Sequence, residues 1–123
     1  MSDISVYEAV GGMPFFVALV DRFYATVAKD IMLRPLYPDD LDPPAEHLAL
    51  FLAQYWGGPT TYSEARGHPR LRMRHASFAV GQRERDHWMA AMVASLEEAH
   101  LEPELHQRFV DYFTMAADQL INS

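Results

Sequence analysis

The sequence predicts an all-α fold, because apolar residues recur at helical spacing and no β-branched alternating run interrupts them. Proline and glycine stand between the periodic segments, where helices are expected to begin and end. The chain has 123 residues, of which 50% are hydrophobic. That length suits one domain over residues 1–123 with a packed core. No uncharged apolar run reaches the roughly 18 residues that a membrane-spanning helix needs, so no such helix is predicted.

The first part of the chain is expected to form a short helix followed by a long one. Residues Val6–Val10 are predicted to be helical as far as a stop at Gly11-Gly12. Pro14 suits a first helical position, where a missing N–H is harmless. The long helix is expected to bury the apolar residues that repeat at helical spacing: Phe15, Phe16, Leu19, Val20, Phe23, Tyr24 and Val27.

The middle of the chain is rich in helix-breaking residues. Prolines at 35, 38, 43 and 44 predict an irregular connection, after which a helix is expected from about Pro44 to Trp56. Its apolar stripe would comprise Leu48, Leu52 and Tyr55, and Gly57-Gly58-Pro59 would end it. The stretch Thr60–Arg70 has no apolar periodicity and is predicted to be a loop, followed by one helical turn around Leu71–His75.

Two longer helices are predicted for the rest of the chain. One opens at Gly81 or Gln82 and runs to about Ala99. Its expected inward-facing residues are Trp88, Met89, Met92, Val93 and Leu96. The other starts at Glu102-Pro103-Glu104, where early acidic residues suit the positive end of the helix dipole. It presents Leu105, Phe109, Tyr112, Phe113, Ala116 and Leu120.

Charge and cysteine content narrow the function classes. The chain carries 17 acidic and 10 basic residues, a formal charge of −7 that works against non-specific nucleic-acid binding. With no cysteine, disulfides, thiolate zinc sites, iron–sulfur clusters and a cysteine nucleophile are excluded. The start of the chain lacks the basic and apolar regions of a secretory signal, so a cytoplasmic location is expected. The basic cluster of Arg66, Arg70, Arg72 and Arg74 is either a solvated loop or a site for an anionic ligand.

The histidines and polar aromatic residues are the candidates for chemistry. The six histidines form no metal-ligand pair, and of them His75 and His87 lie near apolar neighbours. By spacing alone, any one of them is more often a surface or internally satisfied residue than a ligand, by about three or four to one. Tyr24 and Trp88 lie on apolar helix faces, either as ordinary core aromatics or as donors converging on a cavity that holds a partly negative oxygen species. A haem does not follow from this spacing, because it needs only one histidine and an apolar slot.

The densest motifs resemble those of a known family. They are Gln54-Tyr55-Trp56-Gly57-Gly58-Pro59, Tyr62-Ser63-Glu64 and the run from Arg66-Gly67-His68-Pro69 through Arg74-His75. The chain resembles the group II truncated haemoglobins of actinobacterial type, from Tyr7-Glu8-Ala9-Val10-Gly11-Gly12 through Met115-Ala116-Ala117. The resemblance implies a two-on-two helical sandwich around haem b, the iron protoporphyrin IX.

The resemblance also implies roles for particular residues. His75 matches the proximal histidine that binds the haem iron. Tyr24, Tyr37 and Trp88 match the distal residues that stabilise a bound ligand. The other implied haem contacts are apolar residues of the distal helix (Leu48, Phe51 and Leu52) and, near the propionates, Tyr62 and Arg72. The chain departs from the family at Pro44, where a small residue such as alanine usually begins the ligand gate.

The implied function is binding of oxygen and other diatomic ligands such as NO and CO. Each hydrogen bond from a distal donor would add roughly 1–3 kcal/mol, so two would slow oxygen release by on the order of a hundredfold. Such a pocket favours oxygen, nitric oxide or peroxide redox chemistry, with electrons from a separate reductase, over bulk oxygen transport. A haem-based sensor or carrier without catalysis and a haem-free helical interaction domain are the alternatives. Self-association is left open by the sequence.

Overall fold

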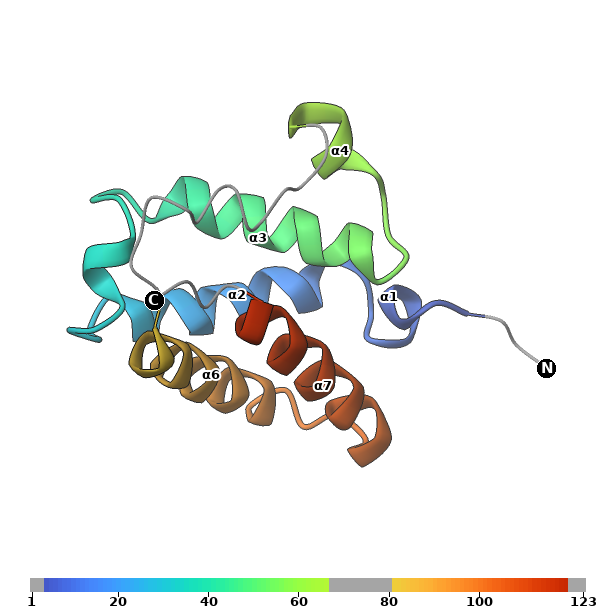
Figure 1. Ribbon diagram of the computed structural model, residues 1–123. Helices are drawn as coiled ribbons and strands as arrows, with labels where there is room; N and C mark the ends of the chain where they lie inside the picture. The colour runs from blue at the N-terminus through green and yellow to red at the C-terminus, as the bar shows by residue number, and fades with distance from the viewer. Residues whose placement is uncertain (1–3, 67–80, 120–123) are drawn as a thin grey trace.

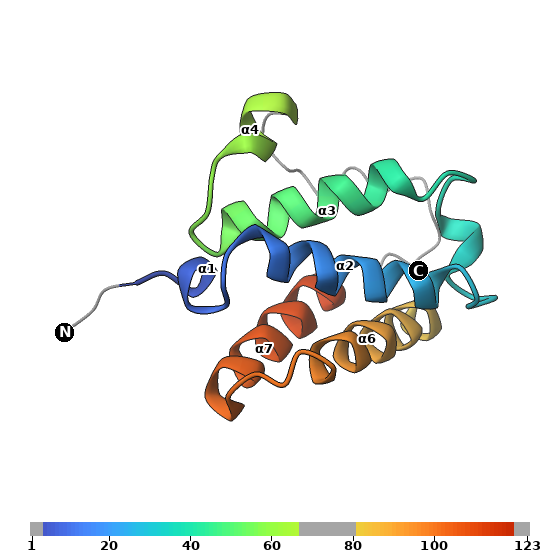
Figure 2. The same cartoon turned by 180° about the vertical axis from the view of Figure 1, so that it is seen from behind.

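The computed structural model describes residues 4–66 and 81–119, and the elements in these ranges are helices joined by turns. In chain order they are α1 (Val6–Ala9), α2 (Met13–Val27), the 3-10 helix η1 (Arg34–Leu36), α3 (Asp42–Tyr55), α4 (Thr61–Arg66), α6 (Gln82–Glu97) and α7 (Pro103–Gln119). Helix α2 packs against α3 on one side and α6 on the other, and α6 packs against α7. The α2–α3 pair therefore lies over the α6–α7 pair (Figure 1), and the view from behind shows the same two layers (Figure 2). The prediction of an all-α fold is confirmed.

The first two helices begin and end close to the predicted residues. The Ser5 hydroxyl caps α1 by accepting the N–H of Glu8 at 3.2 Å. Gly11 and Gly12 then take positive φ angles of 99° and 82°, which the other residues rarely adopt. Helix α2 begins at Met13, so Pro14 is its second residue rather than its first. The positive φ angles of Gly11 and Gly12 let the chain change direction between α1 and α2.

Helix α3 begins two residues earlier than predicted, because its first turn accepts the two prolines at 43 and 44 without losing a hydrogen bond. It ends at the predicted glycines. Gly57 has a φ of 102°, and a Cβ on Gly58 would lie 2.5 Å from the Tyr7 ring. The Tyr7 N–H also donates to the carbonyl of Trp56 at 2.9 Å, so the end of α3 is fixed against α1.

The loop predicted from Thr60 is wrong over Thr61–Arg66, which forms helix α4. Side-chain pairs stabilise this short helix in the absence of an apolar stripe. Thr60 donates its hydroxyl to the Glu64 carboxylate at 2.6 Å. Gln54 on α3 donates to the Ser63 hydroxyl at 2.6 Å and accepts the Ser63 N–H at 2.9 Å. The turn predicted around Leu71–His75 lies outside the described residues.

Helices α6 and α7 match the prediction to within two residues. The Gly81 N–H donates to the Glu84 carboxylate at 2.8 Å, which satisfies a free donor at the start of α6. The Arg22 Nε atom on α2 donates to the carbonyl of Ser95 on α6 at 3.0 Å. Among the described residues, no helix is both long and apolar enough to cross a membrane.

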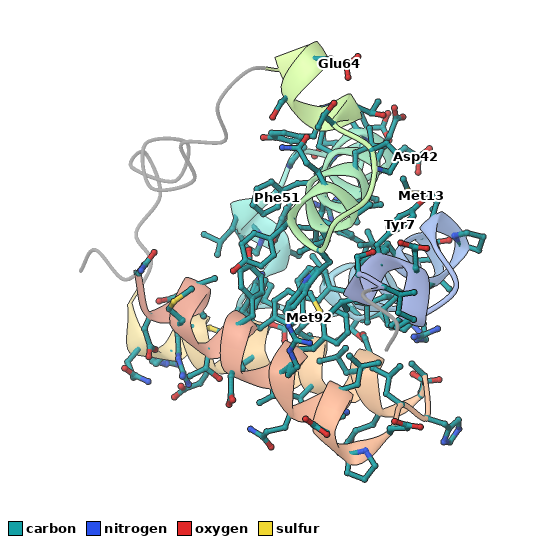
Figure 3. The ribbon with its side chains drawn as sticks, turned by 90° about the vertical axis from the view of Figure 1, so that its right-hand side faces the viewer. Tyr7, Met13, Asp42, Phe51, Glu64 and Met92 are labelled. Atoms are coloured by element: carbon teal, nitrogen blue, oxygen red, sulfur yellow. The ribbon has the colours of Figure 1, made fainter. Side chains whose placement is uncertain are left out.

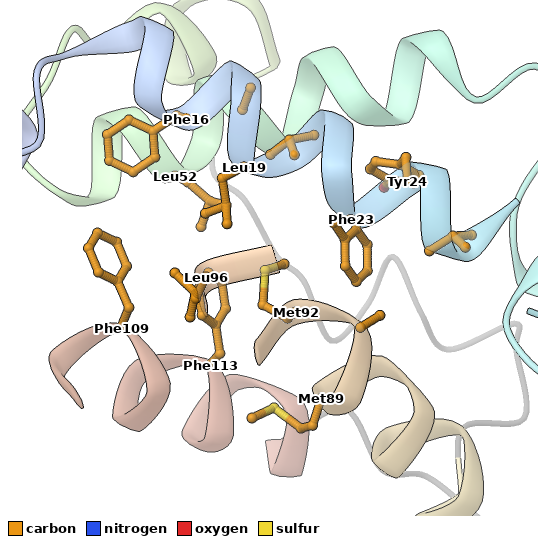
Figure 4. Close-up of a cluster of buried hydrophobic side chains, with 14 of the residues drawn as sticks. Phe16, Leu19, Phe23, Tyr24, Leu52, Met89, Met92, Leu96, Phe109 and Phe113 are labelled. Carbon is orange, nitrogen blue, oxygen red and sulfur yellow. The ribbon is translucent and has the colours of Figure 1, made fainter. Parts of the chain in front are cut away.

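The core lies between the two layers and is strongly aromatic. Figure 4 shows side chains of α2 pointing at those of α6 and α7, with Leu52 of α3 beside them. The side chains that are almost fully shielded include Phe16, Leu19, Phe23, Leu52, Met92, Leu96, Phe109 and Phe113. The predicted apolar faces of α2, α6 and α7 are thereby confirmed, except that Leu120 lies outside the described residues. Tyr55 differs from its predicted stripe, because 51% of it is exposed.

Candidate functional site

Three polar aromatic side chains from separate elements meet at one end of the core. Tyr24 comes from α2, Tyr37 follows η1, and Trp88 comes from α6. The Tyr24 and Tyr37 rings meet edge to face, with centroids 5.4 Å apart. Trp88 packs edge-on against Phe23, with centroids 5.3 Å apart, and hydrogen-bonds to the Tyr37 side chain. The structure thus brings together the distal residues that the sequence analysis names.

Tyr37 is the centre of this hydrogen-bonded group. Burial raises the pKa of Tyr37 to about 12, and hydrogen bonds with Trp88 and Tyr24 act in the opposite direction, lowering the pKa. A hydrogen bond donated to the phenolic oxygen lowers the pKa of the phenol, because it favours the ionised form. The indole of Trp88 has only an N–H to give, so it donates to the Tyr37 oxygen. With its oxygen accepting, the Tyr37 hydroxyl keeps its own proton for a further partner.

Tyr24 supports this arrangement from the core side. Only 8% of Tyr24 is exposed, and burial raises the pKa of its hydroxyl well above 10.0. The neighbouring Tyr37 raises the Tyr24 pKa further, through charge and through their hydrogen bond. Both phenols are therefore neutral donors over the physiological pH range. The group therefore offers the Tyr37 O–H proton without bringing a charge into the core.

Apolar residues of α3 and a buried tyrosine of α4 form a second part of the candidate site. Leu52 is buried, whereas Leu48 and Phe51 are partly exposed. Phe51 meets the buried Tyr62 edge to face, with ring centroids 5.3 Å apart. In Figure 3, Phe51 lies on one side of α3, while Tyr7 and Met13 lie on the other. The resemblance assigned Leu48, Phe51 and Leu52 to the distal helix and Tyr62 to the surroundings of the propionates. The structure joins Phe51 to Tyr62, which lies on α4 and not in the predicted loop.

His87, a candidate by its apolar neighbours, has another partner. Its Nδ1 atom lies 2.9 Å from the Asp30 carboxylate, and its side chain is 43% exposed. Asp30 also accepts the N–H groups of Met32 at 2.8 Å and Leu33 at 3.0 Å. His87 is thus held by a carboxylate at the surface. Sequence reasoning missed Asp30, although an aspartate before a turn is a recognisable signal for such backbone bonding.

Two predicted site residues, His75 and Arg72, lie outside the described residues. The same holds for Arg70, Arg74 and His68 of the basic cluster. Arg66 closes α4 as a helical residue. The proximal side of the site therefore stays a prediction from the resemblance.

Comparisons with known proteins agree on one family. The family model for bacterial-like globins matches residues 5–122. The chain is 36% identical to the group 2 truncated haemoglobin YjbI of Bacillus subtilis, over 94% of this chain and 87% of that one. It is also similar to the crystal structure of a haemoglobin from the thermophilic bacterium Chloroflexus aurantiacus. That match has 50% identity and a TM-score of 0.96, and covers 98% of this chain and 100% of the other. A thermostable haemoglobin from the actinobacterium Thermobifida fusca matches at 50% identity and a TM-score of 0.94, over 97% and 98% of the two chains.

The arrangement of α2, α3, α6 and α7 is that of a two-on-two helical globin. The chain belongs to the bacterial-like truncated globins and is similar to group II members of that family. Globins bind diatomic ligands at a haem.

The hydrogen-bond donors and apolar residues of the candidate site fit a haem and its bound ligand. A haem pocket needs an apolar wall and uncharged donors for a ligand with partial negative charge. The described residues supply the wall from α3 and the donors from Tyr24, Tyr37 and Trp88.

Proposed function

We propose that the chain binds haem b through His75 and stabilises a diatomic ligand by a hydrogen bond from Tyr37, which Trp88 and Tyr24 hold in position by donating to its oxygen. The observation that carries this proposal is the convergence of three neutral donors from α2, the turn after η1 and α6. Each such bond contributes roughly 1–3 kcal/mol when the acceptor carries partial charge. The pocket therefore favours retention of its ligand over rapid release.

Further residues would hold the cofactor. Leu48, Phe51 and Leu52 would contact the apolar ring, and Tyr62 and Arg72 would lie near the propionates. The Tyr62 side chain, only 4% exposed, keeps Phe51 in place through their edge-to-face contact. Arginine suits propionates because its planar fork matches a carboxylate.

Slow ligand release points to redox chemistry rather than bulk transport. Haem supplies an iron that exchanges electrons with oxygen, nitric oxide or peroxide. The chain's own residues would position the ligand, exclude water with the apolar wall, and give or hold a proton at the Tyr37 hydroxyl. Electrons would come from a separate reductase, because no flavin or nicotinamide motif is found in the sequence.

Oxygen dissociation from the ferrous holoprotein tests the donor argument. Tyr37→Phe is expected to speed release most, because Tyr37 alone has a proton left after accepting from its neighbours. Trp88→Phe and Tyr24→Phe should also speed release, with changes from about tenfold to a hundredfold if one to two hydrogen bonds are lost. Val17→Ala, at an exposed position of α2, serves as the control. Unchanged rates in all of the pocket variants would contradict the proposal.

Two further measurements separate the alternatives. A Soret band that is lost in His75→Ala would support ligation by that residue, whereas a colourless protein after hemin addition would favour the haem-free helical domain. Turnover with peroxide or nitric oxide and a reductase distinguishes catalysis from a sensor or carrier. A sensor would bind the ligand with little turnover.

A further inference from the structure

The side chain of Arg34 bonds to the backbone that carries Tyr37, in the connection between α2 and α3 (Figure 1). Its Nη1 atom donates to the carbonyl of Pro38 at 2.9 Å and makes a longer contact of 3.4 Å with the carbonyl of Tyr37. Its Nη2 atom donates to the carbonyl of Asp39 at 2.9 Å. The Arg34 carbonyl in turn accepts the Tyr37 N–H at 3.2 Å. One residue therefore contacts both the N–H and the carbonyl of Tyr37.

Arg34 is itself attached to the body of the protein. Its N–H donates to the carbonyl of Asp30 at 2.8 Å. The preceding residue, Leu33, is almost fully buried and anchors η1 in the core. Asp30 accepts the Leu33 N–H at 3.0 Å and pairs with His87 of α6. The carbonyls that Arg34 binds are therefore held relative to both α2 and α6.

The Tyr37 donor needs support at its backbone as well as at its hydroxyl. Trp88 and Tyr24 hydrogen-bond to the Tyr37 side chain and fix its outer end. The backbone at 37–39 follows η1 and precedes α3, so it belongs to no helix. Hydrogen bonds weaken steeply when their geometry departs from the preferred distance and angle. A shift of this backbone would therefore weaken the bond from the Tyr37 hydroxyl to a ligand.

The planar fork of an arginine suits this task. It presents several N–H donors in fixed directions, and Arg34 uses two separate nitrogens on successive carbonyls. Its positive charge strengthens each of these hydrogen bonds. Pro38 and Asp39 are exposed, so water can replace the donors when the guanidinium is removed. The side chain therefore directs the backbone rather than satisfying buried groups, and its removal should leave the fold intact.

We propose that Arg34 is a positioning residue of the ligand pocket and thereby sets how strongly the pocket favours oxygen over CO. The inference rests on the proposed function, because Arg34 acts through the Tyr37 hydroxyl. Bound oxygen carries partial negative charge and is stabilised by a donor, whereas bound CO carries little charge. Loss of the guanidinium should therefore affect the retention of oxygen far more than the retention of CO.

Dissociation rates of oxygen and CO from the ferrous holoprotein test the proposal. Arg34→Ala should speed oxygen release roughly tenfold and CO release by less than about twofold. Arg34→Lys keeps the charge without the planar fork, so it should release oxygen nearly as fast as Arg34→Ala. Arg108→Ala removes the same charge from an exposed position beside Trp56, and as the control it should match the parent. Parent-like oxygen release in either Arg34 variant would overturn the proposal.

A double-mutant cycle separates positioning from a general loosening of the connection. In a Tyr37→Phe background, Arg34→Ala should leave oxygen release unchanged, because the donor that it positions is already absent. Additive effects of the two substitutions would show that Arg34 does not act through Tyr37. A change in Tyr37→Phe without one in Arg34→Ala would overturn the inference alone. If Tyr37→Phe itself leaves oxygen release unchanged, the proposed function fails and the inference with it.

Two measurements on the CO-bound protein report the position of the donor without reference to rates. A donor close to bound CO lowers the C–O stretching frequency, so Arg34→Ala should shift this infrared band upward, as Tyr37→Phe does. Amide hydrogen exchange at Tyr37 should become faster in Arg34→Ala, while exchange in α7 stays the same. Arg108→Ala should leave the infrared band at the parent frequency. An unshifted band in Arg34→Ala, or unchanged exchange at Tyr37, would contradict the positioning role.

Discussion

The Tyr37 hydroxyl accepts a hydrogen bond from the Trp88 indole and bonds with Tyr24, yet it keeps a proton to donate. A ligand in the pocket would therefore meet one positioned donor whose orientation is fixed by two others. This arrangement also explains why all of the donors are neutral aromatic groups. A lysine or arginine in the same place would require burial of a charge, which is unfavourable without a partner.

Burial of these phenols predicts how stability responds to alkali. The pKa of Tyr24 is raised in the folded protein above its ordinary value of 10.0. Its contribution to stability is therefore complete below pH 10 and is lost as the pH rises, because the unfolded chain releases the proton first. We expect the free energy of unfolding in urea to fall more steeply for the parent protein than for Tyr24→Phe, by about 1 kcal/mol between about pH 10 and 11, because the unfolded phenol is only half ionised at pH 10. Equal slopes would show that Tyr24 ionises as readily in the folded state.

Sequence reasoning located two of the three donors but not their meeting point. Tyr24 and Trp88 lie on periodic apolar faces, so their inward orientation could be predicted. Tyr37 lies between Leu36 and Pro38 in a connection without periodicity. Its place in the group came only from the resemblance, because the path of such a segment depends on long-range packing. His75 and Arg72 stay predictions because they lie outside the described residues.

At the scale of elements, Asp30 joins parts of the fold that carry the donors. Its carboxylate fixes the turn after α2 through the N–H groups of Met32 and Leu33, and it pairs with His87 on α6. Tyr24 lies before this turn, Tyr37 after it, and Trp88 directly follows His87. The connection that sequence analysis described only as irregular is therefore held at its start by the Asp30 carboxylate. Further along it is held by Arg34, whose guanidinium donates to the carbonyls of Pro38 and Asp39 at 2.9 Å each.

We expect Asp30→Ala to lower the free energy of unfolding by about 1–3 kcal/mol, because it leaves backbone N–H groups without a partner. The hydrogen bond with His87, followed by those from Leu33 and Met32, lowers the pKa of Asp30 below its ordinary value of 3.8 despite partial burial. Its contribution is thus present above pH 3.8 and is lost as the pH falls further. Urea unfolding of both proteins should show the difference at neutral pH and its decline below pH 3.8.

The control for this prediction is Asp21→Ala, at an exposed aspartate of α2. It should change stability by no more than about 0.5 kcal/mol. If Asp30→Ala matched this control at neutral pH, the carboxylate would not hold the turn. Separately, the rate of oxygen dissociation from Asp30→Ala shows whether the positions of Tyr24, Tyr37 and Trp88 depend on the Asp30 carboxylate.

Helix α4 shows why some elements escape prediction. Its residues carry no apolar stripe. Gln54 across the chain, Thr60 paired with Glu64, and the buried Tyr62 packed on Phe51 stabilise it. Pairs between separate segments leave no periodic signal in the sequence. By contrast, α2, α6 and α7 each bury a regular apolar face, and their bounds were predicted closely.

At the scale of the whole molecule, the aromatic core has two ends with different roles. Phe23, Tyr24 and Trp88 gather at the end that carries the donors, while Phe16 and Phe109 pack with Trp56 at the other. Phe113 contacts both Trp88 and Phe109, so it connects the two ends. Stability and ligand binding can therefore be changed separately by choosing the end that is mutated.

Phe109→Ala tests this separation. Phe109 is fully shielded and contacts rings from α2 and the end of α3, including Trp56 at 4.7 Å. Truncation should lower the free energy of unfolding by about 3–5 kcal/mol, through lost burial and the cavity left behind. In the fraction that stays folded with haem, oxygen dissociation should match the parent rate, because the donor group lies at the other end. Val17→Ala is the exposed control, expected to lie within about 0.5 kcal/mol of the parent. A large change in oxygen release by Phe109→Ala would show that the two ends act as one unit.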